Sequence, residues 1–409
     1  MSIFLNLSSS AVMLALMALL ALTALRDLCG VKVPRLVPAE RPLRAKKSRP
    51  WEAWAAAFGG LFVLWGLCFL AWCFQDWKGE GFLPLFYERF TVAGDAPHYL
   101  YLAEHGYATE GEKINLIVFY PLYPFLMGLL GRGLGGNFAL AGFLLSQGGF
   151  CAASYLLWKL AERETKRPLR AVIAFWLYPQ AFFALGVFTE GLFLCLSLGC
   201  LHALSRRRFG EAGVWGFFCI LCRVQGMALL PAFVYAVWKE GRKNGFRRSM
   251  LALLAIPVGW GVYLLLNYLH TGDFFAFRYY ESIRPWWQHT QWLGKTVAQQ
   301  WDMARGYPWL GKIIYLPQLL LYFIAAAILF AGLWRGLSTE LVVYGGGYLG
   351  MCYLASWLIS GCRYMSGCHT LYLSAARFRR RGAWYTLIVC EGICCAWFYY
   401  NFMNGQSIM

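Results

Sequence analysis

Long apolar segments separated by short clusters of Lys and Arg are the feature that most limits how this chain can fold. Of its 409 residues, 59% are hydrophobic and only 14% are charged, whereas about a quarter of a soluble domain is charged. The sequence therefore predicts an all-α, polytopic integral membrane protein. The net charge of +17 is concentrated between apolar segments, as in cytoplasmic loops, so we expect no nucleic-acid partner.

The positive-inside rule orients the apolar segments. A loop with eight Lys or Arg follows the first segment and is expected in the cytoplasm, with the N-terminus outside. Later basic clusters, such as residues 159–170, are placed on the same side. About twelve crossings result: 8–25, 51–74, 137–160, 171–188, 191–204, 211–238 (two short helices that turn near Arg223), 250–269, 313–334, 340–359, 364–376 and 383–402.

Two parts are predicted along the chain. Residues 1–50 form an extra N-terminal transmembrane helix and a basic cytoplasmic loop, and residues 51–409 form the main membrane domain. External loops are expected at 75–136 and 270–312. Within the first loop, residues 119–134 are predicted to lie on the outer surface as an amphipathic helix, because a full crossing there would reverse the charge rule downstream.

Four ionisable residues from distant segments fall at the outer edge on this map: Asp95, Glu190, Arg223 and Arg363. Ionisable groups at the edge of the membrane are costly to retain and are often functional. We therefore expect them to meet in one external pocket. The alternative for Asp95 alone is a simple helix cap, since Pro97 suits the first turn of a helix.

The segment 95–107 (DAPHYLYLAEHGY) closely resembles the first luminal loop of the glycosylphosphatidylinositol (GPI) mannosyltransferase II family, membrane glycosyltransferases of the GT-C class. The resemblance continues in order through 119–124 (FYPLYP), 188–193 (FTEGLF), 222–226 (CRVQG) and 361–364 (GCRY). The chain departs from the family pattern at three positions, with Gly94 in place of Trp, Gln225 in place of Asn and Cys362 in place of Pro. These departures leave the acceptor open.

The resemblance implies a GT-C-type helical bundle that transfers a sugar, with mannose expected, from a polyprenyl-phosphate donor to a hydroxyl of a glycan or glycolipid acceptor. The reaction would invert the anomeric centre on the external or luminal face of a bacterial plasma membrane or the endoplasmic reticulum. Phosphate leaves without a general acid, so one base that deprotonates the acceptor is sufficient. Asp95 is the predicted base.

Several residues are candidates for substrate binding. Arg223 and Arg363 offer planar, charged donors suited to phosphate, although a structural pairing with Glu190 is the alternative. The remaining candidates are His98, Tyr99, Tyr120, Tyr123, Glu190, Gln225 and Tyr364. Membrane-interface anchoring is the alternative for Tyr99, Tyr120 and Tyr123. The sequence identifies no particular cofactor. A divalent metal at Asp95, His98 and Glu104 is an open alternative that is not favoured, because these residues lack a recognised ligand spacing.

Two other functions remain open from the sequence. The same fold could use a different lipid-linked sugar, or the protein could move lipid-linked sugars across the membrane. Transport favours polar groups and discontinuous helices near the midplane, whereas the ionisable residues here are predicted at one face.

Overall fold

The computed structural model describes residues 1–32, 40, 49–74, 81–406 and 408. Much of the predicted basic loop, and residues 75–80 of the first external loop, lie outside these ranges. All regular elements of the described chain are helices, and one isolated bridge joins Thr290 and Ala355. The all-α prediction is confirmed.

Within the described residues, six helical segments are long and apolar enough to cross a membrane. They are α1 (Ser2–Cys29), α2 (Pro50–Cys73), α6 (Phe138–Glu164), Arg248–Thr271 (η4, Arg248–Leu254, and α11, Ala255–Thr271), Pro308–Trp334 (α14, Pro308–Leu310; η5, Gly311–Tyr315; α15, Leu316–Trp334) and α19 (Arg381–Met403). The structure thus supports an integral membrane protein with six such helices, fewer than the twelve expected.

The other expected crossings are short helices of 8 to 16 residues. They are α7 (Pro168–Trp176), α8 (Glu190–Ser205), α9 (Phe209–Cys222), α10 (Leu229–Asn244), α16 (Thr339–Cys352) and α18 (His369–Ala376). At about 1.5 Å per residue, the longest spans only about 24 Å, less than the ~30 Å apolar core of a bilayer. As predicted, the chain breaks at Arg223, between α9 and η3 (Val224–Ala228).

These short helices form three consecutive pairs, called hairpins below: α7–α8, α9–α10 and α16–α18. The first helix of each pair begins, and the second ends, at one basic end of the bundle. There, Arg163 at the end of α6 donates to the carbonyl of Ser205 at the end of α8 (2.9 Å). Arg207 pairs with Glu340 at the start of α16 (2.6 Å), and Arg377 donates to the carbonyl of Arg335 (2.7 Å). The basic clusters therefore share one side, as the charge rule predicted.

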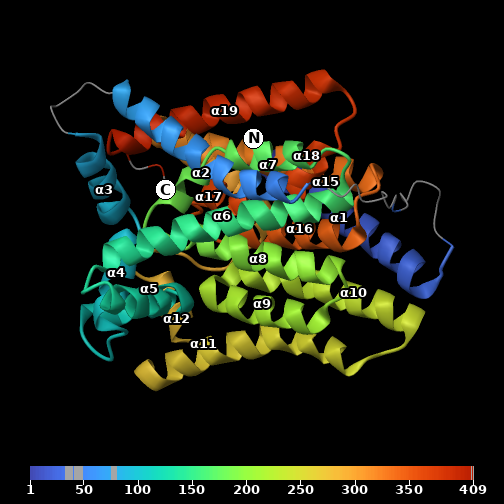
Figure 1. The fold of residues 1–409 in the computed structure, drawn as a ribbon, viewed down its shortest axis with the longest axis horizontal. Helices are drawn as coiled ribbons and strands as arrows, with labels where there is room; N and C mark the ends of the chain where they lie inside the picture. The colour runs from blue at the N-terminus through green and yellow to red at the C-terminus, as the bar shows by residue number, and fades with distance from the viewer. Residues whose placement is uncertain (33–39, 41–48, 75–80, 407, 409) are drawn as a thin grey trace.

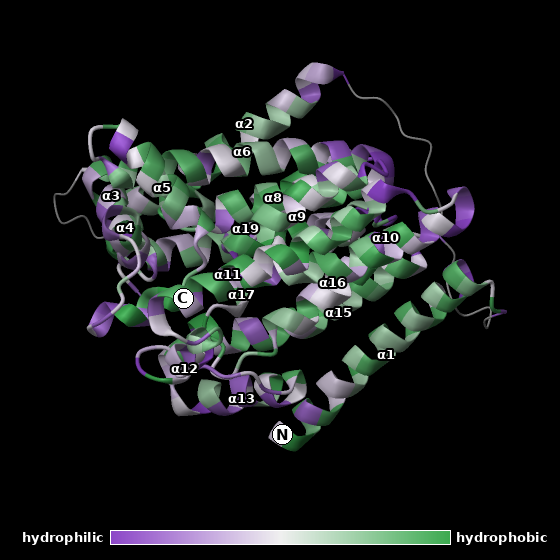
Figure 2. Ribbon diagram, turned by 90° about the horizontal axis from the view of Figure 1, so that it is seen from below, coloured by the Kyte–Doolittle hydropathy of each residue, from purple (hydrophilic) through white to green (hydrophobic). Residues whose placement is uncertain are grey.

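The turns of the hairpins face the opposite end of the bundle, where the loop helices gather. Figure 1 shows α4 (Ala96–His105), α5 (Leu122–Gly133) and α12 (Ala276–Ser282) at this end, beside α3 (Phe82–Val92). In Figure 2, hydrophobic residues occupy the middle of the long helices and hydrophilic residues gather at both ends. The bundle thus has one basic end and one end covered by loop helices.

The first external loop is more compact than expected. Residues 119–134 include α5, which packs between α4 and α6 and is bent by 113° from η1 (Glu112–Val118). This pair is either one broken span or a re-entrant turn. In the second loop, α13 (Leu293–Gly306) packs against α1, so the N-terminal helix is part of the bundle.

The expected crossing at 340–359 is wrong in extent, because α16 ends at Cys352 and a non-helical segment follows. The second loop holds this segment through main-chain bonds from Gln291 to Leu354 (2.7 Å) and from Ser356 to His289 (2.8 Å). These bonds satisfy backbone groups that a helix would otherwise pair internally. Similarly, α18 begins only at His369, and α7 ends at Trp176 before η2 (Ala181–Leu185).

Candidate functional site

The four charged residues predicted to converge do meet, where the hairpin turns reach the first loop. Glu190 is the first residue of α8, Arg223 separates α9 from η3, and Arg363 lies in α17 (Gly361–Tyr364), between α16 and α18. Asp95 precedes α4. Each hairpin therefore contributes one charge, and the loop contributes the fourth.

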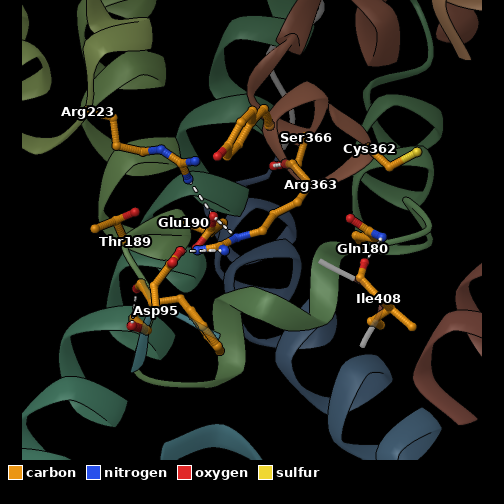
Figure 3. Close-up of polar contacts among 12 residues, drawn as sticks. Asp95, Gln180, Thr189, Glu190, Arg223, Cys362, Arg363, Ser366 and Ile408 are labelled. Carbon is orange, nitrogen blue, oxygen red and sulfur yellow. Dashed lines mark hydrogen bonds and ion pairs between the residues drawn. The ribbon is translucent and has the colours of Figure 1, made fainter. Parts of the chain in front are cut away.

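Arg363 connects both carboxylates of this charge cluster. Its Nε donates to Oε1 of Glu190 (2.5 Å) and its Nη2 to Oε2 (3.2 Å), while Nη1 donates to Oδ2 of Asp95 (2.7 Å). Arg223 donates from Nη1 to the same Oε1 of Glu190 (2.5 Å). Figure 3 shows Arg223 and Arg363 both directed at Glu190, with Asp95 at the end of the Arg363 side chain.

Burial distinguishes Asp95 from Arg363 and Glu190. The side chains of Arg363 and Glu190 are 1% and 2% exposed, whereas 31% of the Asp95 side chain is exposed. Two acids and two bases give the cluster no formal net charge, and a buried ion pair needs such close pairing to offset its desolvation. Asp95 is therefore the carboxylate that a ligand entering the cluster could reach.

Asp95 is at the N-cap position of α4, but its side chain makes no capping hydrogen bond. Its carboxylate instead pairs with Arg363, so the simple-cap alternative does not describe it. Gly94, where the family pattern has Trp, has a φ of 56°, a conformation that glycine adopts without strain. The departure at this position thus fits the tight turn that precedes Asp95.

Aromatic rings flank the two arginines. The Arg363 guanidinium lies 4.9 Å from the ring centre of Phe183 and 4.8 Å from that of Phe188. Arg223 lies over the ring of Tyr364 (5.0 Å), which places this predicted residue beside the cluster. Cation–π contacts of this kind favour a charged guanidinium where water is scarce.

Tyr123 holds the turn that precedes Glu190 through hydrogen bonds. Its hydroxyl bonds with the hydroxyl of Ser146 on α6 (2.9 Å), which donates to the carbonyl of Phe188 (2.8 Å), two residues before Glu190. The Tyr123 side chain is fully buried. Tyr123 fixes the turn that carries Glu190. Because it is buried, it is not available for the sugar-binding role that the sequence suggested.

The loop that carries Arg363 is held by residues that the sequence reasoning missed. The buried Gln318 of α15 donates to the carbonyl of Leu358 (3.1 Å) and accepts from the backbone of Gly361 (2.6 Å). Tyr178 donates to the carbonyl of Cys362 (2.6 Å). A lone Gln inside an apolar helix is the signal that could have identified Gln318, because buried amides require partners.

His98 and Tyr99 follow Asp95 on α4 but differ in position. His98 is half-buried beside Phe119 and Trp286. Burial lowers the pKa of its imidazole, an effect that nearby Asp95 opposes. Tyr99 is buried, and burial, reinforced by Asp95, raises the pKa of its phenol well above the usual value. The imidazole is therefore the more accessible of the two groups.

Two further predicted residues are not joined to the charge cluster. Tyr120 stacks on Tyr263 of α11 at 4.0 Å, near Glu281. Gln225 lies buried in η3, and within the described residues it makes no side-chain hydrogen bond to the four charged groups. Where the chain is described, no three His, Cys, Asp or Glu side chains gather closely enough to hold a metal ion.

An apolar cavity of about 530 Å³ lies along the other end of α4. It is bounded by α4, α5, α9 and α11, and residues such as Leu102, Phe125, Leu221 and Leu266 line it. Leu221 is two residues from Arg223 in the sequence, so the cavity and the charge cluster are built partly from the same helix, α9.

Comparisons with family models, curated proteins and solved structures found no match to this chain. The likeness to the GPI mannosyltransferase II family therefore rests on the short motifs quoted above.

Proposed function

We propose that this protein is a membrane glycosyltransferase that moves a sugar, with mannose as the first candidate, from a polyprenyl-phosphate donor to a hydroxyl acceptor. The observation that carries the proposal is the partly exposed Asp95 carboxylate, held by the buried Arg363 at the covered end of the bundle. The motif resemblance supplies the reaction class, and the geometry is compatible with it.

In the proposed step, Asp95 accepts the proton of the acceptor hydroxyl as its oxygen attacks the anomeric carbon. The bond between that carbon and the phosphate oxygen breaks, and polyprenyl phosphate leaves with the electron pair. Attack opposite to the leaving group inverts the anomeric centre. A positioned base of this kind contributes about 10²- to 10⁴-fold to the rate.

The sequence leaves phosphate binding and structural pairing open for both arginines, and the proposal gives one of these roles to each. Arg363 positions Asp95, since its three nitrogens are already bonded to Asp95 and Glu190. Arg223 is the candidate phosphate ligand: Glu190 is its hydrogen-bond acceptor among the described residues, and 11% of its side chain is exposed. A guanidinium with further N–H groups can bind a phosphate oxygen as well.

The apolar cavity beside α4 is suited to the lipid part of such a donor. A polyprenyl chain needs an apolar path next to the polar site, and the 530 Å³ space between α4, α5, α9 and α11 supplies one. His98 and Tyr99 are candidates to contact the sugar or the acceptor, and Tyr364, beside Arg223, is a further candidate.

The proposed topology is twelve helical passages, of which six are full spans and six form the three hairpins. The hairpins enter from the basic end and return to it. With the basic end in the cytoplasm, Asp95 faces the outside of a plasma membrane or the lumen of the endoplasmic reticulum.

The test is to supply purified protein with isotopically labelled polyprenyl-phosphate mannose and, separately, other polyprenyl-phosphate sugars, each with membrane glycolipid extracts as acceptors. The proposal expects a new glycoside bond with release of polyprenyl phosphate. If the protein transfers a different sugar and not mannose, that sugar replaces mannose in the proposal and the reaction class stays the same.

A lipid-linked-sugar transporter is the second candidate. The short, interrupted helices of the three hairpins resemble the discontinuous helices of transporters. Labelled donor that crosses the bilayer of reconstituted vesicles, with no glycoside formed, would establish this function in place of sugar transfer.

A further inference from the structure

A second large cavity lies at the basic end of the bundle, opposite Asp95. It has a volume of about 1200 Å³ and lies where α2, α7 and α19 begin, beside α6. Five cationic side chains line it, and Glu52 is the one acid among the lining residues. The cations are Arg49, Lys166, Arg167, Arg170 and Arg381.

Among the described residues, the cations of this basic cavity have no acidic partners. In the described part of the chain, none of the five forms an ion pair with Asp or Glu, whereas other basic residues at this end do, such as Lys239 with Glu40 (2.7 Å). Arg170 is held in place by the carbonyl of Phe378 (3.2 Å) and by the ring of Trp384 (4.6 Å). The positive charges around the basic cavity repel one another, so a bound anion would stabilise this arrangement.

Aromatic rings also line the basic cavity, although a site for a small soluble anion does not require them. Trp158, Trp176 and Trp384 line it with the cations. At its edge, Trp51 and Tyr385 are 61% and 56% exposed, at the ends of two helices long enough to cross a membrane. Aromatic side chains at such positions lie at the level of lipid headgroups.

We infer that this basic cavity binds the phosphate headgroup of an anionic phospholipid, with the acyl chains against the exposed aromatic rings. Basic pockets between membrane helices bind such headgroups by charge attraction and hydrogen bonding. The inference is independent of the sugar-transfer proposal, because the cavity lies at the end of the bundle opposite Asp95.

The test measures binding of dioleoyl phosphatidylglycerol and dioleoyl phosphatidylcholine to the purified full-length protein by native mass spectrometry. The inference expects the anionic lipid to bind more tightly. The double variant Arg167→Gln/Arg381→Gln should weaken it by about 30-fold, because each basic residue contributes about 1 kcal/mol near an anionic headgroup.

The matched control is Arg206→Gln/Arg248→Gln, which removes two exposed charges that do not line the cavity. It should leave binding within about twofold, and thermal unfolding should show that both variants are folded. Arg381→Gln alone, with an expected fivefold loss or so, replaces the double variant if that variant unfolds.

Three results would overturn the inference. The first is equal binding of the two lipids, and the second is equal weakening by the two double variants. The third is complete displacement of phosphatidylglycerol by millimolar inorganic phosphate, which would identify the site as one for a soluble anion.

Discussion

Arg363 is the residue on which the candidate site depends most. It is 1% exposed and binds both carboxylates of the cluster. Its replacement leaves Glu190 buried with Arg223 as its remaining charged partner, whereas replacement of Asp95 leaves Arg363 still paired with Glu190. Arg363 and Asp95 therefore differ in their importance for folding.

We predict that Arg363→Gln lowers the free energy of unfolding by about 3–5 kcal/mol, the usual cost of breaking a buried ion pair. Asp95→Asn should cost less than about 1 kcal/mol, because Asp95 is partly exposed. Denaturation of both proteins in the same detergent compares them. Similar losses of stability would contradict the assignment of Arg363 as the central structural residue.

Glu281 of α12 is predicted to make the second loop sensitive to pH. Burial raises the pKa of its carboxyl to about 7, near Tyr120 and Tyr263. The protonated form is therefore favoured in the folded loop. Its contribution to stability is complete below about pH 4.5 and is lost as the pH rises through about 7.

Hydrogen exchange of α12 between pH 5 and pH 8 would measure this effect. After correction for the intrinsic exchange rate, α12 should be better protected at the lower pH, and Glu281→Gln should remove the difference. The exposed Glu110 supplies the control variant, Glu110→Gln, which should behave as the wild type. A pH dependence that persists in Glu281→Gln would assign the effect to another group.

At the scale of elements, the contact between α6 and α8 sets the position of Glu190. A Cβ atom on Gly191 would lie 1.9 Å from the carbonyl oxygen of Ser146, far inside van der Waals distance. The two helices can therefore approach this closely only with glycine at residue 191. The first turn of α8, and with it Glu190, depends on that approach.

We predict that Gly191→Ala destabilises the protein by about 1–3 kcal/mol or more, as overpacking does, and impairs activity by displacing Glu190. Gly148→Ala on α6 is the matched control, because no atom lies within 4 Å of its added Cβ. Thermal unfolding and a transfer assay test both variants. Wild-type behaviour of Gly191→Ala would mean that the α6–α8 contact is looser than the structure shows.

The sequence predicted the helical class, the shared side of the basic clusters and the break at Arg223, because hydropathy and charge report these features directly. The convergence of Asp95 with Glu190, Arg223 and Arg363 followed from the same map. Hydropathy could not separate short hairpins from full crossings, since α8 and α9 are as apolar as spans but only 16 and 14 residues long.

The partners of each site residue could not be predicted for a different reason. Tyr123 and Tyr120 both fit a sugar-binding role by type, but Tyr123 bonds to Ser146 and Tyr120 stacks on Tyr263. These contacts join segments far apart in the chain. Likewise, Gln318 reaches Gly361 across 43 residues, a contact that no local pattern encodes.

At the scale of the whole molecule, the two ends of the bundle are predicted to face opposite sides of the membrane. An epitope inserted after Glu110 would mark the covered end, and one inserted after Asn244 would mark the basic end; both positions are exposed. In sealed cells or vesicles, an antibody should reach the second epitope only from the cytoplasmic side and the first only from the other. Access to both from one side would contradict the topology.

The central claim is that Asp95 removes the acceptor proton during sugar transfer. The most direct measurement is the turnover of Asp95→Asn with a lipid-linked sugar donor that the wild-type protein uses, beside Glu104→Gln as an exposed acidic control on the same helix. We predict a loss of about 10²- to 10⁴-fold for Asp95→Asn, since the amide cannot accept the proton, with unchanged folding and a fully active control. Near-normal turnover of a folded Asp95→Asn protein would contradict the account.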